Sequence, residues 1–267
     1  MTVILSPDSP MLLFGCGNMG RAMLDGWLLS GCNPACFVVV DPHVRDLPVG
    51  VLHVENNSEL KQQFTTAVLA IKPQLFLETA SDIQRLLRPD ALVLSILAGT
   101  RLATLEAALP ERQIVRVMPN LAAAIGKSPM GMFAPASLDR VAIEQLVGPL
   151  GTSYWLSSED QMDAVTALAG SGPAFVYRFI DALAQAGGEL GLDAGSSLGL
   201  ATSMVEGAAL LAAHSGKNPE ELARHVTSPG GTTAAGLAIL DDADTLKNLV
   251  LATLTGARDR GAELAKS

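Results

Sequence analysis

Residues 11–31 read MLLFGCGNMGRAMLDGWLLSG, a short apolar run followed by three spaced glycines and a segment with helical periodicity. The apolar run, Met11 to Phe14, is typical of a buried parallel strand. Gly15, Gly17 and Gly20 then follow with the spacing G-x-G-x-x-G. In a nucleotide-binding turn the first glycine permits the tight bend, the second lets a pyrophosphate approach the backbone, and the third lets the helix pack on the strand. The stretch therefore predicts a dinucleotide-binding βα unit with the phosphates at the start of its helix.

The next apolar run agrees with this interpretation, although a glycine-rich turn in any βα unit has the same spacing. Phe37 to Val40 is apolar and is followed by Asp41. An acid at this place hydrogen-bonds the ribose hydroxyls of adenosine. Because a carboxylate repels a 2′-phosphate, Asp41 predicts a preference for NADH, which Arg45 would oppose by turning toward the phosphate. The alternative role for Asp41 is to cap the turn at Pro42.

Composition excludes several classes of protein. The chain has 267 residues, is 49% hydrophobic and 4% aromatic, and carries a net charge of −9. The acidic balance and the absence of basic runs argue against nucleic-acid binding. The first ten residues do not resemble a signal peptide, and no charge-free stretch reaches the roughly 18 apolar residues of a membrane span. The three cysteines, Cys16, Cys32 and Cys36, lack a complementary pair or histidine cluster, so free thiols in a cytoplasmic protein without a metal site are expected.

Further apolar runs predict the other strands of a mostly parallel sheet. They are Val49 to Val54, Ala67 to Ile71, Leu92 to Leu97 and Ile114 to Val117, with possible edge strands at Met130 to Ala134 and Ser153 to Leu156 around a helix from Leu138 to Leu146. Ligands of such sheets bind at the carboxyl ends of the strands. Residues just after these runs are therefore candidate ligand contacts.

Each candidate at these strand ends also has a plain structural alternative. Lys72 is placed to meet a phosphate, a ribose or a substrate carboxylate. Ala98 and Gly99 leave room for a flat ring, and Asn120 offers an amide at the same edge, but all three also suit ordinary turns. Asn56 or Asn57 reaches the adenosine half of the cofactor or simply begins the next helix as an N-cap.

After about residue 157 the pattern becomes entirely helical. The predicted helices are Met162 to Ala169, Pro173 to Gly191, Asp193 to His214, Pro219 to Val226, Thr232 to Asp241 and Asp244 to Ala265. Small residues lie on several faces of the second and third of these helices. Helices that are apolar nearly all round are buried, and a domain of this size has little interior. Subunit association is expected to cover them.

Two loops interrupt the helical half. The first, Gly170-Ser171-Gly172-Pro173, places Pro173 at the first position of the next helix. The second, Thr227 to Thr233, reads TSPGGTT, in which proline and two glycines end one helix and two threonines open another. Free N–H groups and hydroxyls at such a helix start suit a small carboxylate. The alternative is a well-capped turn between helices, although capping alone needs only one serine or threonine.

Five motifs in this order make the chain resemble the pyrroline-5-carboxylate reductase family. They are Gly15-Cys16-Gly17-Asn18-Met19-Gly20, Ile71-Lys72-Pro73-Gln74, Arg116-Val117-Met118-Pro119-Asn120, Ala169-Gly170-Ser171-Gly172-Pro173-Ala174 and Val226-Thr227-Ser228-Pro229-Gly230-Gly231-Thr232-Thr233. They span nearly the whole chain, and the last is highly specific. The resemblance implies an α/β chain with an N-terminal Rossmann-type, doubly wound, mostly parallel sheet over residues 1–157. An all-helical substrate-binding and dimerisation domain follows over residues 158–267.

The expected activity is reduction of 1-pyrroline-5-carboxylate to L-proline by hydride transfer from NAD(P)H, the last step of proline biosynthesis, in a homo-oligomer that is at least a dimer. The expected cofactor-binding residues are Gly15, Gly17, Asn18, Met19, Gly20, Asp41, Asn57, Ala70, Lys72, Ala98, Gly99 and Asn120. The expected substrate-binding residues are Ser171, Gly172, Ser228, Gly230, Gly231, Thr232 and Thr233. Thr233 is the expected catalytic hydroxyl because it opens a helix directly after the two glycines. Neither a membrane nor a nucleic acid is an expected partner.

Two other functions are alternatives, the first a dehydrogenase of similar layout and the second a protein of another class. A 3-hydroxyacid dehydrogenase relies on a lysine acid in its helical domain, but this chain has no lysine between Lys127 and Lys217. A nucleotide-sensing protein without turnover would not need a second anion site such as the loop from Pro229 to Thr233. An assay with pyrroline carboxylate separates an enzyme from a sensor.

Overall fold

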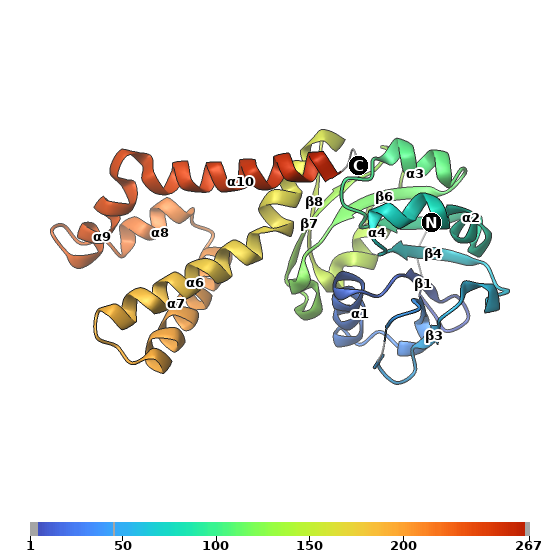
Figure 1. Ribbon diagram of the computed structural model, residues 1–267, viewed down its shortest axis with the longest axis horizontal. Helices are drawn as coiled ribbons and strands as arrows, with labels where there is room; N and C mark the ends of the chain where they lie inside the picture. Colours follow the sequence, from blue (N-terminus) through green and yellow to red (C-terminus); the bar gives the residue numbers. More distant parts are fainter. Residues whose placement is uncertain (1–4, 45, 265–267) are drawn as a thin grey trace. The chain divides into compact units, whose positions relative to one another are not determined.

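The computed structural model describes residues 5–44 and 46–264, and the chain divides into two compact units (Figure 1). The first unit comprises residues 1–170 and 257–267, and the second comprises residues 171–256. Arg45, which was expected to influence cofactor preference, lies outside the described residues. The units divide later than residue 157 because α5 (Met162–Val165) and a π-helical turn (Thr166–Gly170) pack against the sheet.

The first unit is built on one eight-stranded sheet in the order β3-β2-β1-β4-β5-β6-β7-β8. The strands are β1 (Met11–Phe14), β2 (Phe37–Val40), β3 (Leu52–Val54), β4 (Phe64–Leu69), β5 (Leu87–Ser95), β6 (Gln113–Met118), β7 (Ser128–Phe133) and β8 (Gly151–Trp155). Every neighbouring pair is parallel except β6 and β7. This confirms the doubly wound, mostly parallel sheet.

Helices cover both faces of the sheet, and alternate strand residues supply two separate cores. On one face Met11 and Leu13 pack with α1 (Asn18–Leu29) and α4 (Arg140–Val147). On the other face Leu12 and Phe14 pack with α2 (Phe76–Leu86) and α3 (Leu102–Ala108). Because successive strand residues point to opposite faces, a strand covered on both faces reads as a continuous apolar run. That is the pattern of MLLF.

Trp27 fixes α1 to its face of the sheet. Its side chain is fully buried, and its ring stacks on Phe37 with the ring centres 5.8 Å apart. The indole N–H donates to the carbonyl of Leu146 at 2.8 Å, so the polar atom of this large side chain is satisfied. The helix that carries the glycine turn is therefore anchored at its far end.

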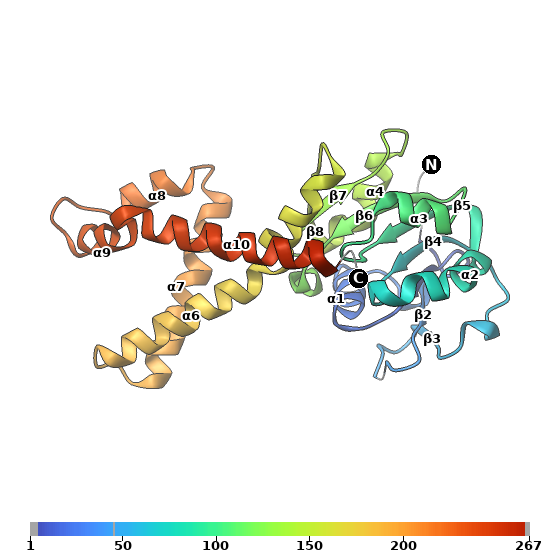
Figure 2. The ribbon, with the colours of Figure 1, turned by 45° about the horizontal axis from the view of Figure 1, so that its top comes forward.

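The second unit consists of helices. They are α6 (Gly172–Glu189), α7 (Ala194–His214), α8 (Pro219–His225), α9 (Thr232–Asp241) and the first part of α10 (Thr245–Leu264). Helices α6 and α7 lie side by side in both views (Figures 1 and 2). At their contact the hydroxyl of Ser197 donates to the carbonyl of Ala184 at 2.6 Å, and Gly187 lies against the same hydroxyl. The small residues on α6 thus allow a close helix pair.

Large apolar side chains remain exposed on the described surface of this unit. Examples are Leu198 (53%), Leu200 (61%) and Leu211 (58%) on α7, and Phe179 (49%) on α6. By length and mean hydropathy (1.3), α7 also meets the criterion for a membrane-spanning helix, although Glu206 interrupts it and the sequence has no charge-free run of that length. The expected surplus of apolar helix face is therefore present.

Several element bounds differ from those expected. Strand β5 begins at Leu87 rather than Leu92, because Leu87 pairs with Phe64 of β4, and a shift in register separates this pair from the next one, Leu92 with Thr66. The helix expected from Met162 to Ala169 is an α-helix only to Val165 and then widens into the π-helical turn. Strand β3 is shorter than expected and begins at Leu52.

Candidate active site

The glycine turn after β1 lies directly against the backbone that follows β4. Gly15 has a φ of +94°, and a Cβ on it would lie 2.7 Å from the carbonyl carbon and oxygen of Ala70. A Cβ on Gly20 would lie 2.8 Å from the carbonyl oxygen of Gly15 and 3.1 Å from the Cβ of Ala70. The amide of Ala70 also donates to Phe14 O at 2.8 Å. Ala70 therefore supports the turn as a small packing residue.

The start of α1 is open where a phosphate is expected. Gly17 occupies the N-cap position with no side-chain hydrogen bond, and nothing lies within 4 Å of the place where its Cβ would be. Asn18 is exposed in the first turn, whereas Met19 is half-buried and packs against the core. Backbone N–H groups at an uncapped helix start attract anions, and the helix dipole adds to the attraction.

Asp41 is bonded to the glycine turn itself. One carboxylate oxygen accepts from the N–H of Cys16 at 2.7 Å, and the other accepts from His43 N at 2.8 Å and Val44 N at 3.1 Å. Burial disfavours the charged form, but these three hydrogen bonds outweigh it and hold the pKa of Asp41 below its ordinary value. The side chain therefore caps the turn at Pro42 and also lies beside the nucleotide-binding turn, while its bond to a ribose stays a prediction.

Lys72, Ala98 and Gly99 follow the carboxyl ends of the neighbouring strands β4 and β5. Lys72 is exposed and precedes a 3-10 turn (Pro73–Leu75). Among the described residues no carboxylate lies within 4.0 Å of its amine. Ala98 is exposed, and Gly99 adopts a φ of +73° in the turn after β5. These residues leave an open edge next to the glycine turn.

Asn120, at the end of β6, is buried and already bonded. Its side-chain oxygen accepts from Ala122 N at 2.9 Å, its amide donates to the carbonyl of Ala169 at 2.9 Å, and its backbone N–H donates to the hydroxyl of Ser128. Asn120 therefore ties the π-helical turn to the sheet edge. In this chain its side chain organises the backbone at the carboxyl end of β6, and one hydrogen of its amide is left for a ligand.

The two asparagines after β3 differ in their contacts. Asn56 is the N-cap of a short 3-10 helix (Asn57–Glu59), and its side chain accepts from Ser58 N at 3.0 Å. The carbonyl and side-chain oxygens of Asn57 instead accept from the guanidinium of Arg85 at 3.1 and 3.2 Å. The N-cap role thus belongs to Asn56, and Asn57 is oriented by α2.

A buried ion pair beneath the same edge was not expected from the sequence. Arg116 of β6 donates to Glu159 at 2.7 Å, and the two side chains are only 5% and 14% exposed. The same Glu159 oxygen accepts from the N–H of Leu102 at 2.6 Å, and Arg101 lies 3.4 Å from the other oxygen. This carboxylate fastens the segment before α5 to the loop after β5. A charged residue in an otherwise apolar strand is the only sequence signal for such a pair.

The loop before α9 has polar groups without partners. Gly231 is the N-cap of α9, and no side chain caps the helix. Within the described part of the chain, the hydroxyls of Ser228, Thr232 and Thr233 make no hydrogen bond, while Gly231 N donates to Ser228 O at 3.0 Å. The alternative of a well-capped turn would use these hydroxyls as caps. These N–H groups and hydroxyls are the groups that a small carboxylate would need, and its binding here stays a prediction.

The remaining candidates of the helical half, Ser171 and Gly172, and its two histidines have ordinary surroundings. Ser171 precedes α6 and Gly172 begins it, and no hydrogen bond joins them to the loop before α9 among the described residues. His225 lies 3.2 Å from the amine of Lys217, and His214 bonds the carbonyl of Leu210. The described residues contain no cluster of three or more histidine, cysteine or acidic residues that would hold a metal.

Comparison with known proteins extends this picture along the whole chain. Residues 159–264 match the family model described as pyrroline-5-carboxylate reductase dimerisation, and residues 11–99 match the model of coenzyme F420-dependent NADP oxidoreductases. The pyrroline-5-carboxylate reductase of Pseudomonas aeruginosa is 35% identical, with 97% of this chain and 98% of that protein covered. The pea enzyme of the same name is also 35% identical over 96% of this chain and 97% of that protein.

Solved structures give the same result. A pyrroline-5-carboxylate reductase from Coxiella burnetii has a TM-score of 0.87 at 30% identity, with 97% of this chain and 99% of that chain covered. The Plasmodium falciparum pyrroline carboxylate reductase, solved with NADP bound, has a TM-score of 0.84 at 25% identity, covering 97% and 99%. Together the Rossmann-type sheet and the open glycine turn define an NAD(P)H-dependent oxidoreductase. Within this class, the chain belongs to the pyrroline-5-carboxylate reductase family.

Proposed function

We propose that the protein reduces 1-pyrroline-5-carboxylate to L-proline with NAD(P)H, as the names of its relatives suggest. The observation that carries the proposal is the presence of two separate anion-accepting helix starts. One, at α1, follows the glycine turn, and the other, at α9, combines free N–H groups with three unbonded hydroxyls. A dinucleotide accounts for the first. A small carboxylate substrate accounts for the second.

In the proposed reaction the cofactor supplies a hydride to the imine carbon, and the ring nitrogen takes up or retains a proton to become the secondary amine. The protein binds and orients the reactants. The loop before α9 holds the substrate carboxylate, and the hydroxyl of Thr233 hydrogen-bonds the ring nitrogen as negative charge moves onto it. The proton itself comes from solvent or is already on the substrate. Ser171 and Gly172 add further contacts to the substrate.

The proposed cofactor contacts are the open glycine turn and the residues that follow β2 to β6. Gly17 and Asn18 face the pyrophosphate, Asn57 approaches the adenosine half, and Lys72 meets a phosphate or a ribose of the cofactor. Asp41 favours NADH over NADPH because its carboxylate repels a 2′-phosphate. A wild-type kcat/KM at least tenfold higher with NADPH than with NADH would contradict this preference.

The proposed assembly is a homodimer or a larger oligomer in the cytoplasm. Two observations support it: residues 159–264 match a dimerisation model, and large apolar side chains are exposed along α6 and α7. A second copy of the same unit presents a complementary apolar face. The three cysteines are free thiols, as in proteins of a reducing compartment.

The substitution Thr233→Ala tests the proposed chemistry. Losing one oriented hydrogen bond to the reacting nitrogen should lower kcat/KM for pyrroline carboxylate tenfold to several hundredfold, about 1–4 kcal/mol of transition-state stabilisation. The dissociation constant for the cofactor should not change. His225→Asn is the control, because His225 contacts Lys217 in the same unit, and it should retain most activity. If the Thr233→Ala enzyme is fully active and the His225→Asn enzyme is inactive, Thr233 is not the hydrogen-bond donor to the ring nitrogen.

A further inference from the structure

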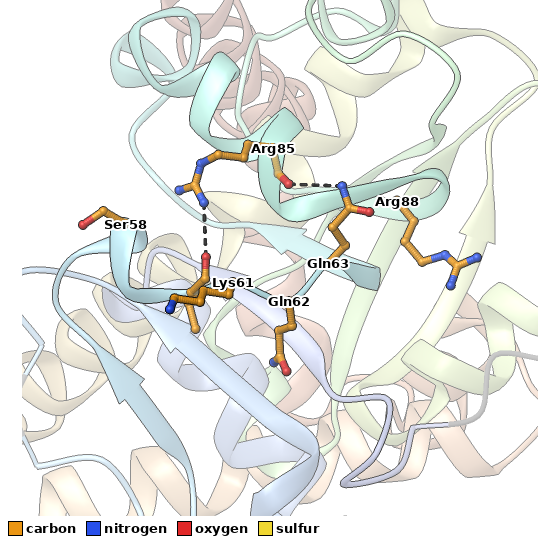
Figure 3. A pocket seen from close by; sticks show the side chains of 7 residues that line it. Ser58, Lys61, Gln62, Gln63, Arg85 and Arg88 are labelled. Carbon is orange, nitrogen blue, oxygen red and sulfur yellow. Dashed lines mark hydrogen bonds between the residues drawn. The ribbon is translucent and has the colours of Figure 1, made fainter.

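A polar hollow lies in the first unit, between the loop before β4 and the end of α2 (Figure 3). Its volume is about 730 Å³. The polar side chains that line it are Ser58, Lys61, Gln62, Gln63, Arg85 and Arg88. Three of these six side chains are cationic and none is acidic. Such a concentration is unusual in a chain with a net charge of −9.

The hollow is separate from the nucleotide-binding turn. Gln63 immediately precedes β4 and Arg88 is the second residue of β5, so the lining lies where these strands begin. Gly15 follows the end of β1, which is parallel to β4, and β4 is parallel to β5. Gln63 and Arg88 therefore lie at the opposite end of these strands from the glycine turn. The nearest approach of the two sites is at Asn57, the proposed adenosine contact, which precedes Ser58 and bonds Arg85, so the hollow has to be tested with the cofactor site already filled.

Nearby carboxylates neutralise little of the positive charge of Lys61, Arg85 and Arg88. Among the described residues no carboxylate lies within 4.0 Å of Lys61 or Arg85. Arg88 pairs with Asp90 at 3.4 Å, but these side chains are 55% and 57% exposed, and an ion pair so open to water is weak. Glu59 does not line the hollow. Positive charge concentrated in a concave surface raises the local concentration of anions.

Arg85 is held in place before any ligand arrives. Its guanidinium donates to the carbonyl of Leu60 at 3.2 Å and to Asn57 at 3.1 and 3.2 Å. Its own carbonyl accepts from the amide of Gln63 at 3.4 Å, and Figure 3 shows both sides of this connection between α2 and the loop. All acceptors of the guanidinium are neutral, so its charge is not cancelled. A preorganised guanidinium loses little entropy when it binds an anion.

From these contacts we propose that the hollow is a binding site for a small anion that carries phosphate groups. A fixed arginine supplies directional donors, and the exposed Lys61 and Arg88 supply additional charge for the several oxygens of a phosphate. The hydroxyl of Ser58 and the amides of Gln62 and Gln63 can bond the uncharged part of the ligand. The volume accommodates a molecule larger than a single phosphate group.

Inorganic pyrophosphate is the probe, titrated by calorimetry into the protein already saturated with NADH, which carries no 2′-phosphate. Saturation fills the glycine turn, where pyrophosphate would otherwise compete with the cofactor. The test variant is Lys61→Gln combined with Arg88→Gln, which leaves the bonds of Arg85 intact. Lys127→Gln is the matched control, because Lys127 is an exposed lysine of the same unit outside the hollow.

The wild-type protein and the Lys127→Gln variant should bind pyrophosphate equally, and the double variant should bind it at least tenfold more weakly. Equal binding by all three proteins would overturn the proposal, as would an absence of binding by the wild type at millimolar pyrophosphate. Citrate, added in place of pyrophosphate, should bind more weakly. Citrate binding is compared between the wild type and the double variant, because the loop before α9 is itself a proposed carboxylate site. Citrate binding that is tighter than pyrophosphate binding and that the double variant loses would show that the hollow selects carboxylates and would refute the assignment to phosphate.

Discussion

Adding a single methyl group at Gly15 or at Gly17 should separate the folding role of the glycine turn from its binding role. At Gly15 a Cβ would lie 2.7 Å from the carbonyl group of Ala70, where ordinary contact begins at 3.4 Å, and the φ of +94° disfavours any L side chain. The left-handed backbone costs about 1–2 kcal/mol, and the overpacking adds about 1–3 kcal/mol. Gly15→Ala should therefore lower the free energy of unfolding by roughly 2–5 kcal/mol.

Gly17→Ala adds the same methyl group where nothing lies within 4 Å. Its φ of −66° is allowed for alanine, so the fold should tolerate the change. The methyl group would stand where the pyrophosphate approaches the backbone. Affinity for NADH and NADPH should fall at least tenfold, although the melting temperature changes little.

Differential scanning fluorimetry and cofactor titration distinguish the two variants. With roughly 2–4 °C per kcal/mol for a protein of this size, Gly15→Ala should lower Tm by at least about 4 °C, while Gly17→Ala should stay within about 2 °C of the wild type. If Gly17→Ala binds cofactor with wild-type affinity, the phosphates do not approach this turn. An unchanged Tm for Gly15→Ala would show that the backbone contact with Ala70 is not restrictive.

Three further predictions concern stability, reactivity and assembly. The pKa of Asp41 in the folded protein is lowered from 3.8, so the stabilisation by its carboxylate is present above that pH and is lost as the pH falls below it. In denaturant titrations the difference in free energy of unfolding between the wild type and Asp41→Asn should be constant between about pH 6 and 8 and should shrink below about pH 4. Burial and then the Asp41 carboxylate raise the pKa of the Cys16 thiol to about 11, so at pH 8 only about a thousandth is thiolate. In peptide mapping of the native protein, iodoacetamide should modify the half-buried Cys32 well before Cys16, and the reverse order would contradict the burial of the turn. Leu200→Glu places a charge on the exposed apolar face of α7 and should shift sedimentation toward monomer, whereas an unchanged oligomer would exclude this face from the interface.

The parallel sheet can be predicted from the sequence because the signals for it lie within short segments of the chain. MLLF alternates between two faces that are both covered, and the glycine spacing requires a strand before it and a helix after it. The starts of α7 and α8 are likewise predictable, since the side chains of Asp193 and Asn218 accept hydrogen bonds from the first turns of these helices. These are N-caps, which leave a clear sequence signature.

Contacts between distant residues could not be predicted in the same way. Arg116 and Glu159 are 43 residues apart in the sequence, and the residues around each of them do not indicate that the two side chains form an ion pair. The bond from Asn120 to Ala169 depends on the π-helical turn, a widening that helical periodicity does not reveal. At these points tertiary hydrogen bonds decide the local structure.

The most direct measurement is a steady-state assay of the purified wild-type protein with 1-pyrroline-5-carboxylate and either NADH or NADPH, followed by chiral analysis of the product. Hydride transfer to the imine carbon predicts one L-proline formed for each cofactor oxidised, with saturation in both substrates. If the protein binds the cofactor but oxidises none of it above the rate without protein, the chain is a nucleotide-binding protein and not a reductase of this imine.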